Sequence, residues 1–133
     1  MSKSIKLKDN MFFNGEICDI GSNSNGEYIK WANGIMICHK YLRLTGSEQN
    51  FNVAYGSVYY NGNSTTWTYP QNFISKPTVV GTAFFKGGLG GYGNASEPST
   101  SQANGYIYYT TLYNFGTTDG RVGVDFIAIG KWK

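Results

Sequence analysis

Residues 27–40 read EYIKWANGIMICHK, two runs of β-branched and aromatic residues on either side of Asn33-Gly34. Asn-Gly strongly favours a two-residue type I′ turn, because both central positions of that turn need a positive φ. Such a turn pairs Trp31 with Met36 and places alternate side chains on the same side of the hairpin. The apolar face predicted in this way consists of Ile29, Trp31, Met36 and Cys38. The stretch therefore predicts a β-hairpin that packs this face against a core.

The composition indicates an all-β protein. Charged residues make up 14% of the 133 positions and aromatic residues 17%, and there are 18 glycines. Leucine and glutamate, which favour helices, are scarce. Short runs rich in β-branched and aromatic residues alternate with turns that contain Gly and Asn, a pattern typical of antiparallel sandwiches and barrels. Because a chain of this length forms one domain by default, we expect a single antiparallel β-sandwich.

Alternation with a period of two predicts further strands after the hairpin. These strands span residues 64–69, 78–85, 105–115 and 121–132. Both faces of residues 78–85 are apolar, so we expect this strand at the centre of its sheet. The last two strands should pair with each other as a hairpin. Residues 86–104 are small and polar and predict a long loop, and loops beyond about 12–15 residues are usually functional or disordered.

The N-terminal part of the chain differs from the rest. Residues 1–25 carry few apolar side chains for their length and cannot build a core alone. We expect them to form an extended arm and linker that packs on the domain or on neighbouring copies, with residues 26–133 forming the β-sandwich. A frayed tail is the alternative.

Charge and hydropathy disfavour several classes of function. The formal net charge is +3 and the sequence has no dense run of Lys and Arg, which argues against nucleic-acid binding. No stretch of about 18 apolar residues is present, so we expect no membrane insertion. The N-terminus lacks the apolar core of a signal peptide, which favours synthesis in a cytoplasm. Cys18 and Cys38 are too few for a disulfide framework, and we predict that they do not form a structural disulfide.

The residues that could carry chemistry give no pattern of a catalytic site. Residues 88–93, GLGGYG, match the G-x-G-x-x-G expression of dinucleotide sites, but no predicted helix follows to bind a pyrophosphate. His39, the single histidine, lies within a predicted strand, which does not suit a Ser-His-Asp triad. Three copies of His39 near a trimer axis could instead bind a metal ion. The carboxylates show no pair placed across a cleft, as a glycosidase requires. We therefore expect no enzyme activity, no metal and no cofactor.

Aromatic residues are the main remaining signal. The 11 tyrosines, 8 phenylalanines and 3 tryptophans exceed what one core of this size can hold. Some tyrosines must lie at a surface or an interface, where an apolar ring with a hydrated hydroxyl is favoured. Two uses are open, namely packing between protomers and stacking on sugar rings.

Three segments resemble the C-terminal domains of bacteriophage tail-fibre and receptor-binding proteins. They are residues 26–37 (GEYIKWANGIMI), residues 67–80 (WTYPQNFISKPTVV) and residues 126–132 (FIAIGKW). The first resembles the opening of those domains, the second their F-P-x-x-F segment and the third their terminal strand. The layout is also similar to H-type lectins, which are small trimeric β-sandwiches that bind sugars. The matches cover residues 26–44 and 66–132, with a weaker match at residues 4–10.

The resemblance implies a homotrimer at the tip of a tail fibre or of a related contractile particle, attached to host cell-surface polysaccharide. Its partners would be further copies of itself, other tail or baseplate proteins and the host glycan. Its location would be the virion tail tip, after synthesis in the host cytoplasm. Two other functions stay open: a structural tail or baseplate protein that binds no glycan, and a glycan-degrading enzyme.

We expect the carbohydrate site on the long loop, residues 86–104, and on the turn at residues 116–121, because rigid scaffolds present binding groups on loops. The residues predicted to bind sugar are Tyr92, Asn94, Ser96, Asn104, Tyr106 and Tyr108. Tyr92 would stack on a sugar ring, and the asparagines and the serine would hydrogen-bond its hydroxyls. The face that carries Tyr106 and Tyr108 is the second choice.

Overall fold

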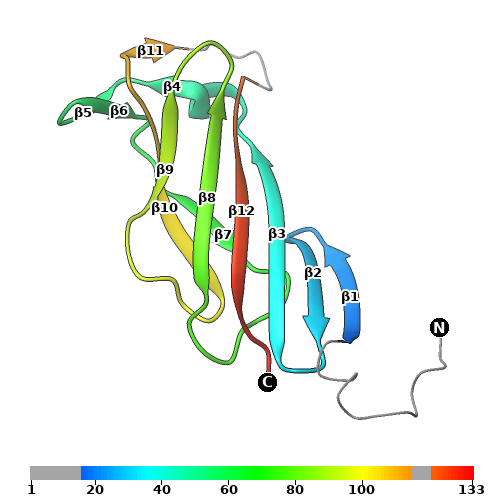
Figure 1. Cartoon of the computed structure of the whole chain (residues 1–133). Helices are drawn as coiled ribbons and strands as arrows, with labels where there is room; N and C mark the ends of the chain where they lie inside the picture. Colours follow the sequence, from blue (N-terminus) through cyan, green and yellow to red (C-terminus); the bar gives the residue numbers. More distant parts are fainter. Residues whose placement is uncertain (1–15, 115–120) are drawn as a thin grey trace, which may run out of the picture.

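Two facing antiparallel β-sheets form the part of the chain that the computed structural model describes, residues 16–114 and 121–133 (Figure 1). The first sheet has five strands in the order β1-β2-β3-β12-β8, and every neighbouring pair is antiparallel. Its strands are β1 (Ile17–Asn23), β2 (Gly26–Trp31), β3 (Ile35–Arg43), β12 (Val122–Lys131) and β8 (Thr78–Phe85). The antiparallel β-sandwich predicted from composition and alternation is confirmed.

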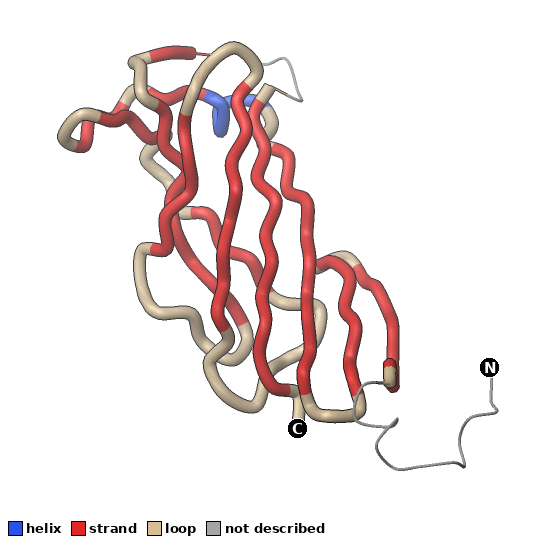
Figure 2. The backbone as a smooth tube through the Cα atoms, in the orientation of Figure 1, coloured by secondary structure: helices blue, strands red, loops and turns tan. Residues whose placement is uncertain are grey.

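The second sheet is built around β10 (Gln102–Tyr109). β9 (Gly90–Asn94) pairs with one edge of β10, while β6 and then β7 pair with the other edge, and β5 pairs with β6. The bounds of these three are β5 (Val53–Tyr55), β6 (Val58–Tyr60) and β7 (Thr65–Thr68). A small sheet of β4 (Asn50–Phe51) and β11 (Tyr113–Asn114) and the 3-10 turn η2 (Gly46–Gln49) lie at one end of the sandwich (Figure 2).

The expected position of residues 78–85 within their sheet is wrong. The strand has the predicted bounds, but β8 is an edge strand of the first sheet rather than a central one. Val79 and Phe85 point into the core, whereas the alternate residue Val80 is 55% exposed. The apolar side chains on the outer face of β8 are therefore not explained by burial within the described chain.

Two further long-range expectations are also wrong. β10 and β12 do not form a hairpin, because β12 pairs with β3 and β8 while β10 pairs with β6, β7 and β9. The two strands belong to opposite sheets and face each other across the core. The predicted loop at residues 86–104 contains β9, whose small residues Gly91 and Gly93 lie directly opposite Tyr108 and Tyr106 of β10.

The hairpin at residues 27–40 is present, but its register differs from the predicted one. Lys30 pairs with Met36, so the loop has three residues instead of two. Gly34 has a φ of +95°, and its N–H donates a 3.0 Å hydrogen bond to the Trp31 carbonyl. Three-residue hairpin loops commonly place glycine at such a left-handed position. The additional loop residue moves Trp31 and Ile29 to the outer face, and the inner face carries Met36 and Cys38 from β3 with Lys30 and Tyr28 from β2.

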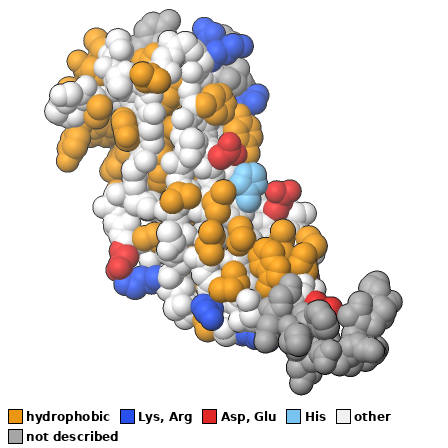
Figure 3. All heavy atoms as spheres, in the orientation of Figure 1, with side chains coloured by type: hydrophobic (Ala, Val, Ile, Leu, Met, Phe, Trp, Pro, Cys, Tyr) orange, Lys and Arg blue, Asp and Glu red, His pale blue; other side chains and the backbone are white. Residues whose placement is uncertain are grey.

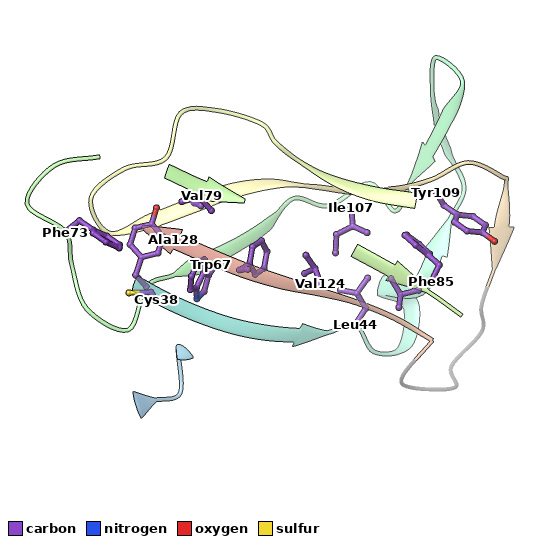
Figure 4. Packing of buried hydrophobic residues seen from close by; sticks show 14 of the residues in the cluster. Cys38, Leu44, Trp67, Phe73, Val79, Phe85, Ile107, Tyr109, Val124 and Ala128 are labelled. Carbon is purple, nitrogen blue, oxygen red and sulfur yellow. The ribbon is translucent and has the colours of Figure 1, made fainter. Parts of the chain in front are cut away.

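The core lies between the two sheets and is rich in aromatic rings (Figure 4). Phe126 of β12 is fully buried and stacks on Trp67 of β7, with ring centroids 5.2 Å apart and an interplanar angle of 17°. At the other end, Phe85 of β8 stacks on Tyr109 of β10 at 4.7 Å. The alternate residues Val122, Val124, Phe126 and Ala128 of β12 are all buried. Rings from both sheets thus join the two layers.

The described part of the predicted arm is strand. β1 pairs with β2, and the last residues of the expected arm and linker form the end of β1 and the tight turn that leads into β2. Residues 1–15 of the predicted arm lie outside the described residues, as do residues 115–120 of the turn expected to contribute to the site. Among the described residues, no helix is long and apolar enough to cross a bilayer.

Candidate functional site

A pocket of about 430 Å³ opens on the outer face of the second sheet, and we call it the tyrosine pocket. Its lining residues come from β5, β6, β9, β10 and the segment after β9. They are Tyr55, Val58, Tyr60, Gly93, Asn94, Ala95, Tyr106 and Tyr108. This volume is within the range of small-molecule sites, which span roughly 300–1,000 Å³.

Two glycines of β9 create the hollow. Gly91 and Gly93 pair with Tyr108 and Tyr106, so all four positions face outward, but β9 has no side chain there. The Tyr108 ring lies over Gly91, where an added Cβ would be only 2.5 Å from the tyrosine hydroxyl. At Gly93 an added Cβ would meet no heavy atom within 4 Å, so this position leaves open space beside Tyr106. The backbone of β9 therefore forms the floor of the pocket.

Tyrosine rings form the walls and support one another. Tyr60 and Tyr106 meet edge to face with centroids 5.3 Å apart, and Tyr55 meets Tyr60 in the same manner at 6.3 Å. Such pairs contribute about 0.5–1.5 kcal/mol beyond the area that they bury. Tyr106 remains 38% exposed. The array is thus held in place by ring contacts while keeping ring surface open to a ligand.

The polar groups of the pocket are neutral. The polar residues of the lining are the four tyrosines and Asn94, and Asn94 Nδ2 donates a 3.2 Å hydrogen bond to the Val79 carbonyl of β8, so this amide is directed towards the first sheet. None of the eight described lining residues carries a formal charge. The site combines flat apolar rings with uncharged donors and acceptors.

The structure separates the six residues predicted to bind sugar. Tyr106, Tyr108 and Asn94 line the tyrosine pocket, whereas Ser96 and Asn104 do not. Ser96 lies in the exposed segment after β9, and Asn104 faces β7, where its Oδ1 accepts a 3.2 Å hydrogen bond from Thr66 Oγ1. The tyrosine pocket therefore combines the second-choice face with residues 93–95 of the first-choice segment.

The assignment of Tyr92 as the stacking residue is not supported by its position. Tyr92 pairs with Ile107, which puts its side chain on the inner face, and its ring meets Phe126 edge to face at 4.9 Å. Burial raises the pKa of Tyr92 to about 12. The ring occupies space left by Gly81 and Gly105, where an added Cβ would lie 2.7 Å or less from it. Tyr92 is thus a core residue beneath the pocket.

Three lining residues were absent from the predicted site, namely Tyr55, Val58 and Tyr60. The sequence does contain a local signal for their hairpin, because Gly56 follows Tyr55 and adopts a left-handed φ of +61°. What brings Tyr60 beside Tyr108 is the pairing of β6 with β10 across about 50 residues of chain. That pairing has no local signature.

His39 lies on the outer face of the first sheet rather than in a cleft. Its Nδ1 is 3.2 Å from Glu27 Oε1 and its Nε2 is 3.3 Å from Asp125 Oδ1. The two carboxylates approach opposite edges of the ring, so the three groups do not converge on one point. Within residues 16–114 and 121–133, no group of three or more His, Cys, Asp and Glu side chains is arranged to hold a metal ion.

The sequence matches no protein-family model and no curated protein. Two solved structures are similar. The first is an N-truncated R1-type pyocin tail fiber, with 17% identity over 97% of this chain and 98% of that chain and a TM-score of 0.54. The second is a P. aeruginosa R2 pyocin fiber fragment of C-terminal residues 323–691, with 12% identity over 98% of this chain and 37% of that chain and a TM-score of 0.49. The chain therefore shares its fold with the R1-type tail-fiber fragment.

Proposed function

We propose that this chain is the tip domain of a phage-tail-type fibre and that the tyrosine pocket attaches the particle to cell-surface glycan. The fold shared with the R1-type pyocin tail fiber supports the first part. The observation that carries the second part is the array of four tyrosines around an uncharged pocket. Binding sites of this kind combine mostly apolar walls with a few polar groups that fix orientation.

The chemistry of the lining favours a neutral sugar. The C–H face of a pyranose ring can stack on a tyrosine ring, and tyrosine hydroxyls can pair with sugar hydroxyls. A sialic acid, a uronic acid or a phosphorylated sugar would call for Arg or Lys at the site. The described lining contains neither, so the proposed ligand is a neutral hexose within a host polysaccharide.

The proposed assembly is a homotrimer at the tail tip of a virion or related particle, joined to other tail or baseplate proteins. A single lectin-like site is expected to bind weakly, near the roughly 4 kcal/mol of a millimolar complex. Three linked sites raise apparent affinity about 100-fold or more without any new contact. Trimerisation and weak single sites are therefore compatible with firm attachment to a polysaccharide.

The test compares the wild-type chain with Tyr106→Ala on an array of neutral and acidic bacterial glycans. The sugar selected by the array is then titrated as a free monosaccharide by NMR, so that avidity does not contribute. We expect Tyr106→Ala to weaken single-site binding at least tenfold, which corresponds to about 1.4 kcal/mol.

Tyr41→Ala is a matched control, because Tyr41 is 40% exposed, close to the 38% of Tyr106, but lies on the first sheet. It should bind as wild type does. Unchanged binding by Tyr106→Ala would move the site elsewhere. Absence of binding to any glycan would favour a structural tail or baseplate protein, and release of reducing ends from host polysaccharide would favour a glycan-degrading enzyme.

A further inference from the structure

The outer face of the first sheet is apolar where a solvated antiparallel sheet would be polar. Antiparallel sheets with one face in water alternate apolar residues inward and polar residues outward. Here both sets are apolar over much of the sheet. We call the outward set the isoleucine face, and it consists of Ile17, Ile20, Ile29, Ile35, Ile37, Val80, Ile127 and Ile129.

The strand register lines these side chains up in rows. Ile20 pairs with Ile29, Ile29 with Ile37, and Ile37 with Ile129, so four isoleucines form one row across β1, β2, β3 and β12. In the neighbouring row Ile127 pairs with Val80 of β8. Directly paired residues on one face lie about 4.5–5.5 Å apart, which makes the apolar surface continuous.

The exposed part of this surface is large. Ile20 is 64% exposed and Ile129 46% exposed, and the other members range from partly to largely exposed. Together they leave on the order of 600 Å² of apolar area open, at the upper end of the roughly 300–600 Å² patch of a typical monomer. A stable interface buries about 800 Å² on each partner, so this patch could supply most of one.

Three ionisable side chains on the same outer face contact one another: His39, which pairs with Ile127 in the strand register, and its neighbours Glu27 and Asp125. His39 contacts Glu27 through one ring nitrogen and Asp125 through the other, at 3.2 and 3.3 Å. In Figure 3 the histidine and two acidic side chains lie beside hydrophobic side chains that gather over β12, β3 and β2. Because these three groups contact one another on the same sheet, covering this part of the face would leave none of the three without a partner.

We infer that the copies of the proposed homotrimer associate through the isoleucine face, an inference that rests on the proposed assembly. A surface of isoleucine and valine offers dispersion contacts and area but few directional groups, which suits contact with further copies of the same chain. The tyrosine pocket is on the other sheet, so self-association here leaves the pocket open. The inference stands on the register and exposure of the first sheet and does not rest on glycan binding.

The test measures the mass of the full chain by sedimentation equilibrium from about 1 to 100 μM. We expect wild type to form a closed oligomer, and Ile129→Lys to weaken association at least 100-fold and sediment as a monomer. Val80→Lys, at a second position of the face, should act in the same direction. Far-UV circular dichroism checks that each variant remains folded.

Leu89→Lys is the matched control, since Leu89 is 76% exposed and lies outside the isoleucine face. Its mass should equal that of wild type. Monomeric wild type throughout the concentration range would overturn the inference. So would folded oligomers of both Ile129→Lys and Val80→Lys. A monomeric wild type in which Ile129→Lys lowers the melting temperature would indicate that the chain's own residues 1–15 cover the face, which also overturns association between copies.

Discussion

Phe126 is the side chain that most directly joins the two sheets, and we expect Phe126→Ala to be strongly destabilising. The ring is fully buried, stacks on Trp67 at 5.2 Å and receives the edge of Tyr92 at 4.9 Å. Removing a buried phenylalanine ring costs about 3–5 kcal/mol, because apolar burial is lost and a cavity is left between rings that cannot collapse.

The expected cost converts into a measurable shift. For 133 residues the entropy of unfolding is about 0.28 kcal/mol per kelvin at the midpoint, so 4 kcal/mol lowers the melting temperature by about 14 °C. The assays are thermal unfolding for the melting temperature and urea unfolding for the free energy, both followed by tryptophan fluorescence at two protein concentrations. The cost of Phe126→Ala should be the same at both, since the contact lies within one chain.

Ile127→Ala is the neighbouring control, because Ile127 points outward from the same strand. Its cost should be below 1 kcal/mol in the isolated fold. Any additional loss should depend on protein concentration, as expected for a residue at an interface between copies. Equal and concentration-independent costs for Phe126→Ala and Ile127→Ala would refute the inward and outward assignment of β12.

Two other predictions concern the first sheet. Cys18 is exposed, whereas Cys38 is fully buried and burial raises its pKa to about 11. The Cys18 thiol should therefore react quickly with Ellman's reagent and the Cys38 thiol only in denaturant. If neither thiol reacts even in denaturant, the two cysteines form a disulfide. Lys30→Ala should cost about 1–2 kcal/mol in urea unfolding, because the side chain is 17% exposed, lies 3.2 Å from Gln71 Oε1 and contacts two aromatic rings. Lys86→Ala, in an exposed turn, should cost under 0.5 kcal/mol, and equal costs for both lysines would contradict the observed register.

Local alternation was sufficient to predict several strands and their faces. Residues 65–69 place Trp67 and Tyr69 inward, and β12 buries every second residue from Val122 to Ala128. Thr66 and Thr68 alternate with Trp67 and Tyr69, and Gly123 and Asp125 alternate with Val122 and Val124, so the buried face is clear at these positions although Ile127 and Ile129 are apolar too. A pattern of this kind records which side of a strand is buried, and that information is carried by each strand separately.

The arrangement of strands in sheets could not be obtained in the same way. β10 and β12 are separated in the order of described strands by only the two-residue β11, yet they lie in opposite sheets. Pairing β12 with β3 joins residues separated by about 80–96 positions, and no local property of either strand specifies that choice. β8 misled the prediction because its outward residues, such as Val80, are apolar although they are not buried in the described chain.

One residue of loop length reversed the expected faces of the first strand of the hairpin. Asn33-Gly34 favours a two-residue turn, but the observed loop includes Ala32 as well, and a shift of one residue exchanges the two faces of a strand. Trp31 then points outward and Lys30 inward. The side of the sheet to which the Tyr92 side chain points was equally hard to predict, because its neighbours Gly91 and Gly93 have no side chains and so show no alternation of apolar and polar residues.

The outer faces of the two sheets differ in a way that agrees with the two proposed uses. Isoleucine dominates the outer face of the first sheet, and tyrosine surrounds the pocket on the second. An isoleucine side chain has no polar atom to dehydrate, so covering it permanently with another copy carries no polar penalty. A tyrosine has a hydroxyl that stays hydrated between encounters and can be exchanged for a sugar hydroxyl on binding. The distribution of these two residue types therefore suits the proposed lasting contact on the first sheet and the proposed reversible contact on the second.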